Sequence, residues 1–299
     1  MEPKYANLLK TLGYPVFEID GVNWYAYNGF LRPACLPHVQ PQIRSEQARR
    51  ALAASGCRFV RWESDFGQAQ GSRWWHVLRQ APYSMDQLSG NTRSKVRRGA
   101  KRLSARRLDP DVVAAQGMNV CRAAVERYGR DGFLPSEQVF EAKVEAARRH
   151  PESFEFFGVF RDDQLVGYSE NHIDSGAVFW ESIWYDPDAL RDYSSYLLTH
   201  AMLDYYLNEL GLHYASDGSR SLYHDTGVQN FFVEKFGFRR QYARLHVLYS
   251  PMLARVMIAL RPFQTLIEKA KQGSRFDIFA RLNGVLLQDE IARSEQGKS

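Results

Sequence analysis

The chain has 299 residues, of which 44% are hydrophobic and 13% aromatic, and its net charge is +5. This composition is typical of a soluble globular protein and excludes a largely disordered or fibrous chain. The three cysteines, Cys35, Cys57 and Cys121, lack paired spacing, which argues against a disulfide framework or a cysteine zinc site and favours a reducing cytoplasm. The sequence predicts neither a secretory signal nor a run of about 18 apolar residues that would span a membrane.

The first 85 residues predict a compact α/β unit. Alternating aromatic residues over Pro15–Leu31 predict strands in a hairpin. The Ala-rich stretch Gln47–Ser55 predicts a helix, and Arg58–Glu63 and Arg73–Leu78 predict two more strands.

A basic linker helix is predicted next, over 86–102. Ser89 or Asn91 can cap it, and its apolar stripe is Val96, Ala100 and Leu103. Residues 93–107 hold eight Lys or Arg and no acid. Such local charge favours one anionic partner, which is tRNA or another RNA, a carrier protein or a membrane surface. The alternative is a solvated helix face.

From residue 103 the predicted order is strand, two helices, three strands, helix, strand, helix, strand. The expected ranges are 103–108, 111–128, 136–150, 154–160, 164–173, 177–185, 191–210, 213–216, 227–236 and 239–249. Ser136 is the expected cap of the second helix. The tail from Met252 is predicted to be helical, in about three pieces divided by Pro262 and Gly273. The expected units are therefore 1–85, 86–102, 103–250 and 251–299.

This order, with the sequence KFGF at Lys235–Phe238 before the last strand, resembles the GNAT acyltransferase fold, in which a Gly-Phe commonly follows the final helix. The segment NTRSKVRRGAKRL resembles the linker helix of Fem-type peptidoglycan aminoacyl ligases and related tandem-GNAT proteins. The resemblance covers about residues 1–250. It implies an α/β, tandem GNAT-like protein with a degenerate first half, a complete second half, a mixed sheet flanked by helices and a helical tail.

The resemblance also implies a function, at the level of the fold. This is acyl or aminoacyl transfer to an amine or hydroxyl of a cell-envelope or lipid-like intermediate, in the cytoplasm or at the inner face of the membrane. The donor would be acyl-CoA, an acylated carrier protein or aminoacyl-tRNA, with no metal, since the eight histidines show no metal-binding spacing. Two alternatives are a noncatalytic GNAT-fold scaffold and an RNA-binding protein that uses residues 93–107.

The chain departs from the GNAT pattern at two positions. GNAT enzymes hold the acyl-CoA pyrophosphate in a Gly-rich turn at a helix start, where backbone N–H groups bind phosphate. The matching residues, 191–196, read RDYSSY, so Arg191 is kept and both glycines are absent. Arg191, Ser194 and Ser195 are the predicted anion-binding residues. Where many GNAT enzymes have a Tyr general acid, this chain has Val233.

Polar residues gather in SDGSRSLYHDT, 216–226, directly after a predicted strand, where ligands of open α/β sheets bind. His224 is a candidate for proton transfer, with Asp217 or Asp225 to orient its ring. Arg220 is a candidate clamp for a carboxylate or phosphate. The candidate substrate-binding neighbours are Ser219 and Gln229.

The same stretch has a purely structural interpretation. Asp225 or Thr226 would cap the following helix, Asp217 would form a turn with Gly218, and Arg220 would pair with Asp217. Both interpretations can hold together.

The central hairpin contains acids within aromatic strands. Alternation predicts that Glu170 shares a face with His172, and Glu181 a face with Ile183. Glu181 matches the GNAT base that activates an amine or its bridging water, because a charge in such a strand is costly unless it is paired or used. Alternatively, Glu181 faces solvent or pairs with a cation.

The tail segment MLARVMIALRPFQTLIEK is amphipathic and carries cations. It is expected to pack against the body of the protein or against a second subunit, which would form a homodimer. Lying on a membrane surface is the alternative.

Overall fold

A computed structural model describes residues 4–39, 41–128, 134–222, 227–273 and 277–296. The first part of the chain comprises α1 (Lys4–Thr11), β1 (Val16–Ile19), β2 (Val22–Tyr27), β3 (Phe30–Pro33), α2 (Ser45–Ser55), β4 (Phe59–Ser64), β5 (Trp74–Gln80) and α3 (Gly90–Gly99). Helix α1 has no counterpart among the predicted elements. Where a hairpin was predicted there are three strands, because Asp20-Gly21 and Asn28-Gly29 both have positive φ and make two tight turns.

The second part confirms the predicted order of elements. It comprises β6 (Ser104–Leu108), α4 (Pro110–Tyr128), α5 (Glu137–Arg149), β7 (Phe154–Arg161), β8 (Gln164–Asp174), β9 (Ala177–Tyr185), α6 (Ser194–Asp204), β10 (Tyr214–Ser219), α7 (Val228–Phe236) and β11 (Arg239–Tyr249). The capping predictions also hold, since the Ser89 hydroxyl accepts from Thr92 N–H and the Ser136 hydroxyl from Val139 N–H. Helix α6 ends in a π-helical turn over Tyr205–Glu209.

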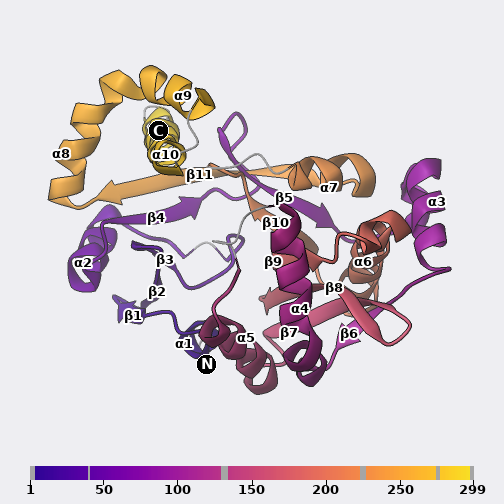
Figure 1. The fold of residues 1–299 in the computed structure, drawn as a ribbon. Helices are drawn as coiled ribbons and strands as arrows, with labels where there is room; N and C mark the ends of the chain where they lie inside the picture. The colour runs from indigo at the N-terminus through magenta and orange to yellow at the C-terminus, as the bar shows by residue number, and fades with distance from the viewer. Residues whose placement is uncertain (1–3, 40, 129–133, 223–226, 274–276, 297–299) are drawn as a thin grey trace.

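The strands form one mixed sheet in the order β1-β2-β3-β4-β11-β5-β10-β9-β8-β7-β6 (Figure 1). Strand β11 connects the two halves of this sheet. Its residues 239–243 pair with β5, and its residues 244–249 pair with β4. The last strand of the second half therefore completes the sheet of the first half.

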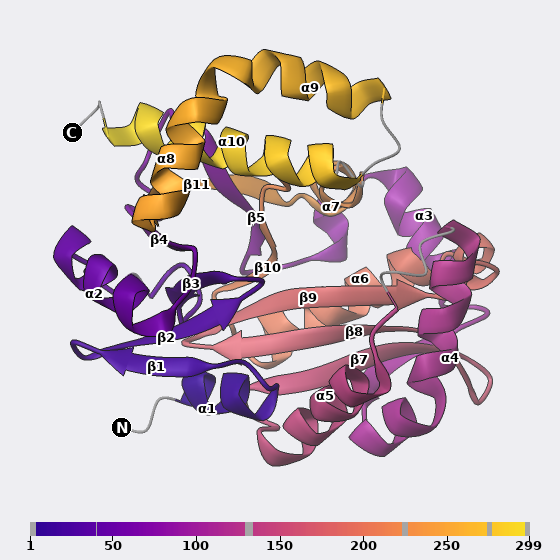
Figure 2. The ribbon, with the colours of Figure 1, turned by 60° about the vertical axis from the view of Figure 1, so that its left-hand side comes forward.

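Two apolar cores lie on opposite faces of the sheet. Helices α1, α4 and α5 cover one face, with a core that includes Leu8, Val113 and Phe154. Helices α3, α6 and α7 cover the other, with a core that includes Val96, Leu198 and Phe232 (Figures 1 and 2). The first is called the α5 face below and the second the α6 face.

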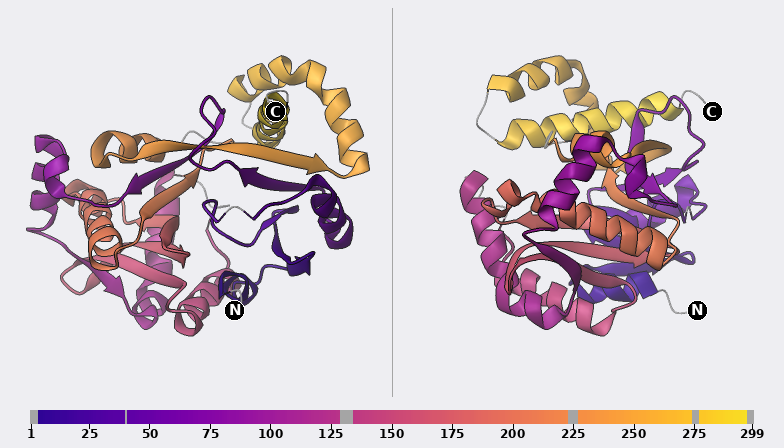
Figure 3. Two further views of the ribbon diagram at one scale, coloured as in Figure 1. Left: turned by 180° about the vertical axis from the view of Figure 1, so that it is seen from behind. Right: turned by 90° about the vertical axis from the view of Figure 1, so that its right-hand side faces the viewer.

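The tail is helical, as predicted, and comprises α8 (Pro251–Leu260), α9 (Gln264–Gly273) and α10 (Asp277–Gln296), with Pro262 in the bend between α8 and α9. Helix α10 packs on β11, where Ile291 and Ala292 join Leu245 and Trp74 in a small core (Figure 3). The segment 252–269, which was expected to pack against the body or a second subunit, packs on the body through Met257 and Ile267, which contact Leu286 of α10. Within the described residues, no helix has the length and apolar character needed to cross a bilayer.

Gly158, in β7, is closely packed: a Cβ there would lie 2.7 and 2.9 Å from the two terminal carbons of Leu108 and 2.9 Å from Leu165 Cδ1, and both leucines are buried. We expect Gly158→Ala to lower the free energy of unfolding by about 1–3 kcal/mol through overpacking. Gly90→Ala is the matched control, since a Cβ at Gly90 meets no atom within 4 Å. Urea unfolding of both variants tests this, and equal stability of the two would contradict the packing of β7.

Candidate functional site

The parallel strands β9 and β10 part near the centre of the sheet. They pair at Tyr214 with Ala177, Ala215 with Val178 and Ser216 with Phe179, and no pairing between them continues beyond this point in the described residues. Beyond it, the facing edges of the described parts of the two strands are not hydrogen-bonded to each other, and the Gly218 N–H bonds to Ser216 Oγ instead. The parting of β9 and β10 is the geometric centre of the candidate site.

Asp217 is the first residue of β10 after the last pair with β9, and its side chain lies on the α6 face. Its neighbour Ala215 belongs to the core of that face, and Gln229 at the start of α7 lies within hydrogen-bonding distance of the carboxyl. Burial raises the pKa of Asp217 to about 7, although the hydrogen bond from Gln229 acts in the opposite direction. A carboxyl with this pKa can exchange a proton near neutral pH.

Glu181 lies on the opposite, α5 face because β9 is bulged at this residue. Strand β8 pairs Glu170 with Ser182 and Asn171 with Trp180, which leaves Glu181 as the extra residue. The bulge turns Glu181 toward His172, whereas Ile183 packs in the core of the α6 face. The expectation that Glu181 and Ile183 share a face is therefore wrong.

Glu181 belongs to a network of partly and fully buried charges. Its Oε2 lies 3.1 Å from His172 Nε2 and 3.5 Å from Lys143 Nζ of α5. Lys143 also bonds to Glu170, which is 1% exposed and accepts a hydrogen bond from Trp184 Nε1. Of the predicted alternatives, pairing with cations thus describes the position of Glu181.

These contacts decide the protonation of the network. Burial opposes the ionisation of Glu181, but the charge and hydrogen bond of His172, with those of Lys143, lower its pKa to about 2. Burial likewise disfavours the Lys143 ammonium, and the carboxylates of Glu170 and Glu181 outweigh it and raise the Lys143 pKa. Glu181 is therefore ionised at neutral pH and is a weak proton acceptor.

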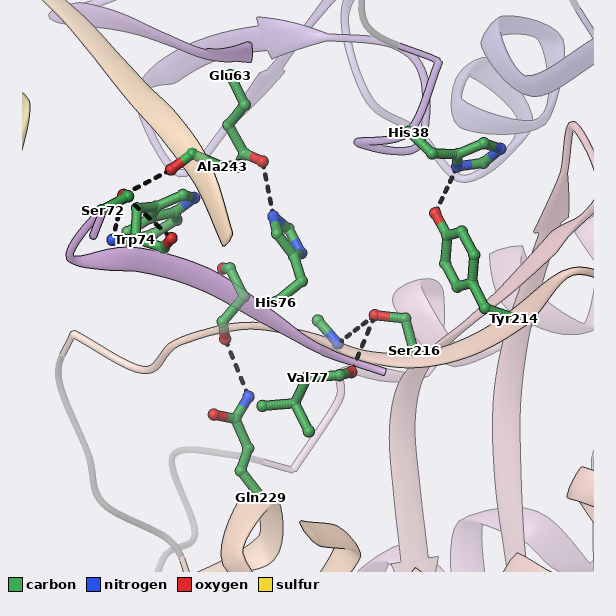
Figure 4. A network of polar contacts seen from close by, with 12 residues as sticks. His38, Glu63, Ser72, Trp74, His76, Val77, Tyr214, Ser216, Gln229 and Ala243 are labelled. Carbon is green, nitrogen blue, oxygen red and sulfur yellow. Dashed lines mark hydrogen bonds and ion pairs between the residues drawn. The ribbon is translucent and has the colours of Figure 1, made fainter. Parts of the chain in front are cut away.

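A second histidine–carboxylate pair comes from the first half of the chain. His76 Nε2 in β5 lies 2.6 Å from Glu63 Oε2 in β4, and the two side chains are 5% and 11% exposed (Figure 4). Burial disfavours the Glu63 carboxylate, but the charge and hydrogen bond of His76 lower its pKa to about 2. In the same view, Tyr214 Oη contacts His38 Nδ1 at 2.5 Å, and Ser216 Oγ donates to Val77 O at 3.3 Å (Figure 4).

Arginines gather around Trp75 at the start of β5. The guanidinium of Arg220 lies 4.3 Å from the centre of the Trp75 ring and that of Arg240 lies 4.4 Å from it. Arg220 donates to the carbonyl of Arg73 and not to Asp217, so the predicted Arg220–Asp217 pair is not formed. Burial and repulsion from Arg73 and Arg240 lower the pKa of Arg220. Among the described residues no carboxylate pairs with Arg220 or Arg240.

Several solved structures have a fold similar to that of this chain. The C-terminal domain of a protein named as a lysylphosphatidylglycerol synthetase, from Agrobacterium fabrum, aligns over 87% of this chain and 91% of its own, with a TM-score of 0.55 and 11% identity. FemX aligns over 80% and 89%, with a TM-score of 0.53 and 11% identity. The chain has the tandem GNAT-like fold. A conserved protein of unknown function from Bacteroides thetaiotaomicron aligns over 83% and 90%, with a TM-score of 0.50 and 10% identity.

Comparison of the sequence with protein-family models and with curated proteins finds no match. The likeness to FemX and the synthetase domain is thus one of fold.

In this tandem GNAT-like protein an acidic side chain, that of Asp192, lies just before the start of α6. The Asp192 carboxylate accepts from Arg102 at 2.5 Å and from Arg161 at 2.7 Å, and these hydrogen bonds lower its pKa. Of the predicted anion-binding residues, Arg191 is 86% exposed and lies 4.0 Å from Asp188. Ser194 is fully buried without a partner for its hydroxyl, and Ser195 is half-buried.

Two predicted catalytic residues, His224 and Asp225, lie outside the described residues, as does Thr226. Of the others in this loop, Ser219 accepts a hydrogen bond from Gln229 through its backbone carbonyl, at 3.0 Å. Val233, where many GNAT enzymes have a Tyr, is 39% exposed on α7. No group of three or more metal-ligating side chains occurs among the residues that the structure describes.

The cations of α3 are only partly available. Lys95 Nζ lies 3.2 Å from the Tyr196 hydroxyl, and the Arg98 guanidinium lies 5.0 Å from the centre of the Tyr193 ring. Both contacts fasten α3 to the start of α6. Arg97 of α3 and Lys101, which follows the helix, are exposed.

Sequence reasoning missed Lys143 and the Glu63–His76 pair. The rule that pointed to Glu181, a charged residue within an aromatic strand, applies equally to Glu63 in RFVRWES and to His76 in WWHVL. For Lys143 there is no such signal, because a lysine on an amphipathic helix normally faces water.

The network around Glu181 predicts a specific loss of stability in acid. Because the pKa is lower in the folded state than in the unfolded state, the ionised Glu181 stabilises the fold above about pH 5, and this contribution is lost as the pH falls toward 2. Between pH 5 and pH 3 we expect wild-type protein to lose about 1–2 kcal/mol more unfolding free energy than Glu181→Gln.

Urea unfolding at several pH values measures this difference. Glu234→Gln serves as control, since Glu234 is 63% exposed and, among the described residues, forms an ion pair only with Lys235. Parallel pH dependences for wild type and Glu181→Gln would contradict the depressed pKa.

Proposed function

We propose that this protein transfers an acyl or aminoacyl group to an amine or hydroxyl of a cell-envelope or lipid-like acceptor. The observation that carries the proposal is the parting of β9 and β10 with an acid on each side, Asp217 on the α6 face and Glu181 on the α5 face. The likeness of fold to FemX and to a domain named for lysylphosphatidylglycerol synthesis supports the same class of reaction.

In this proposal Asp217 is the general base. A group with a pKa of about 7 can take the proton of the attacking amine or hydroxyl and still be substantially ionised at neutral pH. The nucleophile then bonds to the acyl carbon, the carbonyl electron pair moves to oxygen, and the tetrahedral intermediate expels the carrier's oxygen or sulfur. Asp217 returns its proton to this leaving atom. Backbone N–H groups at the open strand edges would stabilise the oxyanion.

Glu181 has a different role because its pKa is about 2. It remains ionised and is held by His172 and Lys143, so it can orient a polar or cationic part of the acceptor on the α5 face. The sequence-based role of Glu181 as base is the alternative, which requires the acceptor to displace one of these cations. His224 remains a further candidate for proton transfer.

The arginines around Trp75 favour a polyanionic donor. Arg220 and Arg240 both contact the Trp75 ring and lack carboxylate partners among the described residues, which suits phosphate and stacked bases. Of the three donors considered, aminoacyl-tRNA fits this surface best. Acyl-CoA and acylated carrier protein also carry phosphate and remain to be tested against it.

Asp217→Asn is expected to lower kcat/KM for transfer by at least about 100-fold and to remove an increase in rate as the pH rises through about 7. The assay is transfer of a labelled acyl group from the donor that binds. Since burial favours the protonated carboxyl, the variant should also lose the wild type's decline in stability as the pH rises from about 4 to about 7. Unchanged transfer by a folded variant would contradict the role of Asp217.

A thermal-shift series identifies the donor. Coenzyme A, acetyl-CoA, a long-chain acyl-CoA, acylated carrier protein and aminoacyl-tRNA are compared on wild type, on Arg220→Met with Arg240→Met, and on the control Arg149→Met, which changes an exposed arginine of α5. We expect aminoacyl-tRNA to raise the Tm of wild type and control, but not that of the double variant. A coenzyme A donor that stabilises all three equally would exclude the arginines as its site.

RNA binding without catalysis is the second candidate, favoured by the exposed cations of α3. Replacement of Arg97, Arg98 and Lys101 by Gln should then weaken RNA retention and reduce its salt dependence. Unchanged retention would exclude this candidate. A noncatalytic scaffold would instead leave the cellular phenotype intact in Asp217→Asn and Glu181→Gln.

A further inference from the structure

The outer side of α8 and α9 is apolar where a surface helix is normally polar. Their inner side packs on α10 through Met257, Ile267 and Leu286, all buried. The two helices and the 3-10 turn between them (Arg261–Phe263) nevertheless expose five large hydrophobic residues, Met252 (78% exposed), Val256 (43%), Ile258 (60%), Phe263 (54%) and Leu266 (66%). We call these five residues the tail ridge.

The tail ridge brings together many of the exposed hydrophobic residues in one short segment. It contains half of the large hydrophobic side chains recorded as exposed in the described residues, within fifteen positions of the chain. The side chains of this segment that are buried against the body are different ones, Met257 and Ile267. Large hydrophobic side chains exposed together in one segment indicate an interaction surface.

We propose that the tail ridge docks this protein onto the surface of an anionic lipid bilayer. Charge favours a negative partner, since Arg255 and Lys269 are exposed beside the ridge and Glu268 is the only acid in 251–269. Arginine and lysine at the border of an apolar helix side are the pattern by which helices lie in the headgroup region.

The shape of the tail favours a bilayer over a second copy of the chain. Helices α8 and α9 form the outer edge of the molecule, and α10 lies between α9 and β11 (Figures 1 and 2). A projecting edge can insert into headgroups, whereas a stable dimer needs a flat, self-complementary patch of about 800 Å² from each partner. Docking through this edge leaves the parting of β9 and β10 free, so it does not depend on the proposed transfer reaction.

Vesicle co-sedimentation of the full chain tests the proposal. The probes are vesicles of phosphatidylcholine alone and of phosphatidylcholine with phosphatidylglycerol. We expect wild type to bind the anionic vesicles, less so as salt is raised, and to bind the neutral ones weakly. The combined change Ile258→Ser, Phe263→Ser and Leu266→Ser should weaken binding by at least about tenfold.

Matched controls separate the ridge from general effects. Val139→Ser with Leu210→Ser removes two exposed hydrophobic residues outside the tail, 48% and 46% exposed, and should leave binding unchanged. Replacement of Arg97, Arg98 and Lys101 by Gln should reduce binding less than the ridge variant does. Circular dichroism and Tm confirm that each variant is folded.

Three results would overturn the proposal. These are wild type that does not bind anionic vesicles, a folded ridge variant that binds as well as wild type, and loss of binding only in the α3 variant. Light scattering of wild type in solution adds a fourth, namely a dimer that the ridge substitutions dissociate. None of these readouts uses a donor or acceptor, so their failure is distinct from failure of the transferase proposal.

Discussion

The pairing of β11 with two different strands is the constraint on which the rest of the structure depends. Residues 239–243 complete the sheet beside β5, and residues 244–249 complete it beside β4. Because β5 in turn pairs with β10, a strand from the first half lies next to the parting where Asp217 is found. The degenerate first half thus contributes to the geometry of the site, and neither half has a complete sheet without the other.

The buried polar groups of this fold are arranged by face. On the α5 face, carboxylates meet cations at close range, as in Glu181 with His172 and Lys143, and this pairing offsets the cost of removing charge from water. On the α6 face, Asp217 is buried with no cationic partner in the described part of the chain, and burial raises its pKa. Two acids near one parting of strands therefore have opposite protonation properties, which suits one to hold charge and the other to move a proton.

The start of α6 shows how this fold can vary at its anion-binding turn. In place of glycines that would admit a phosphate, the chain has Tyr193 at positive φ and an Asp192 carboxylate between two arginines. The backbone also approaches α3 closely, since a Cβ at Gly99 would lie 3.2 Å from the Tyr193 carbonyl oxygen. Cations without carboxylate partners among the described residues lie instead around Trp75.

The sequence by itself determined the order of elements from residue 103 onward, their approximate bounds and the caps Ser89 and Ser136, because periodicity and capping are local properties of the chain. Its resemblance to GNAT proteins indicated the tandem GNAT-like class. The sequence also pointed to Glu181 and Asp217. Only the tertiary structure decided which partners these acids have and how their pKa values shift. The bulge that separates Glu181 from Ile183 depends on the register with β8, the partner Lys143 comes from α5, 38 residues earlier, and the pKa of Asp217 depends on burial under α7. Register, distant pairing and burial arise from contacts between segments far apart in sequence, which no local pattern specifies.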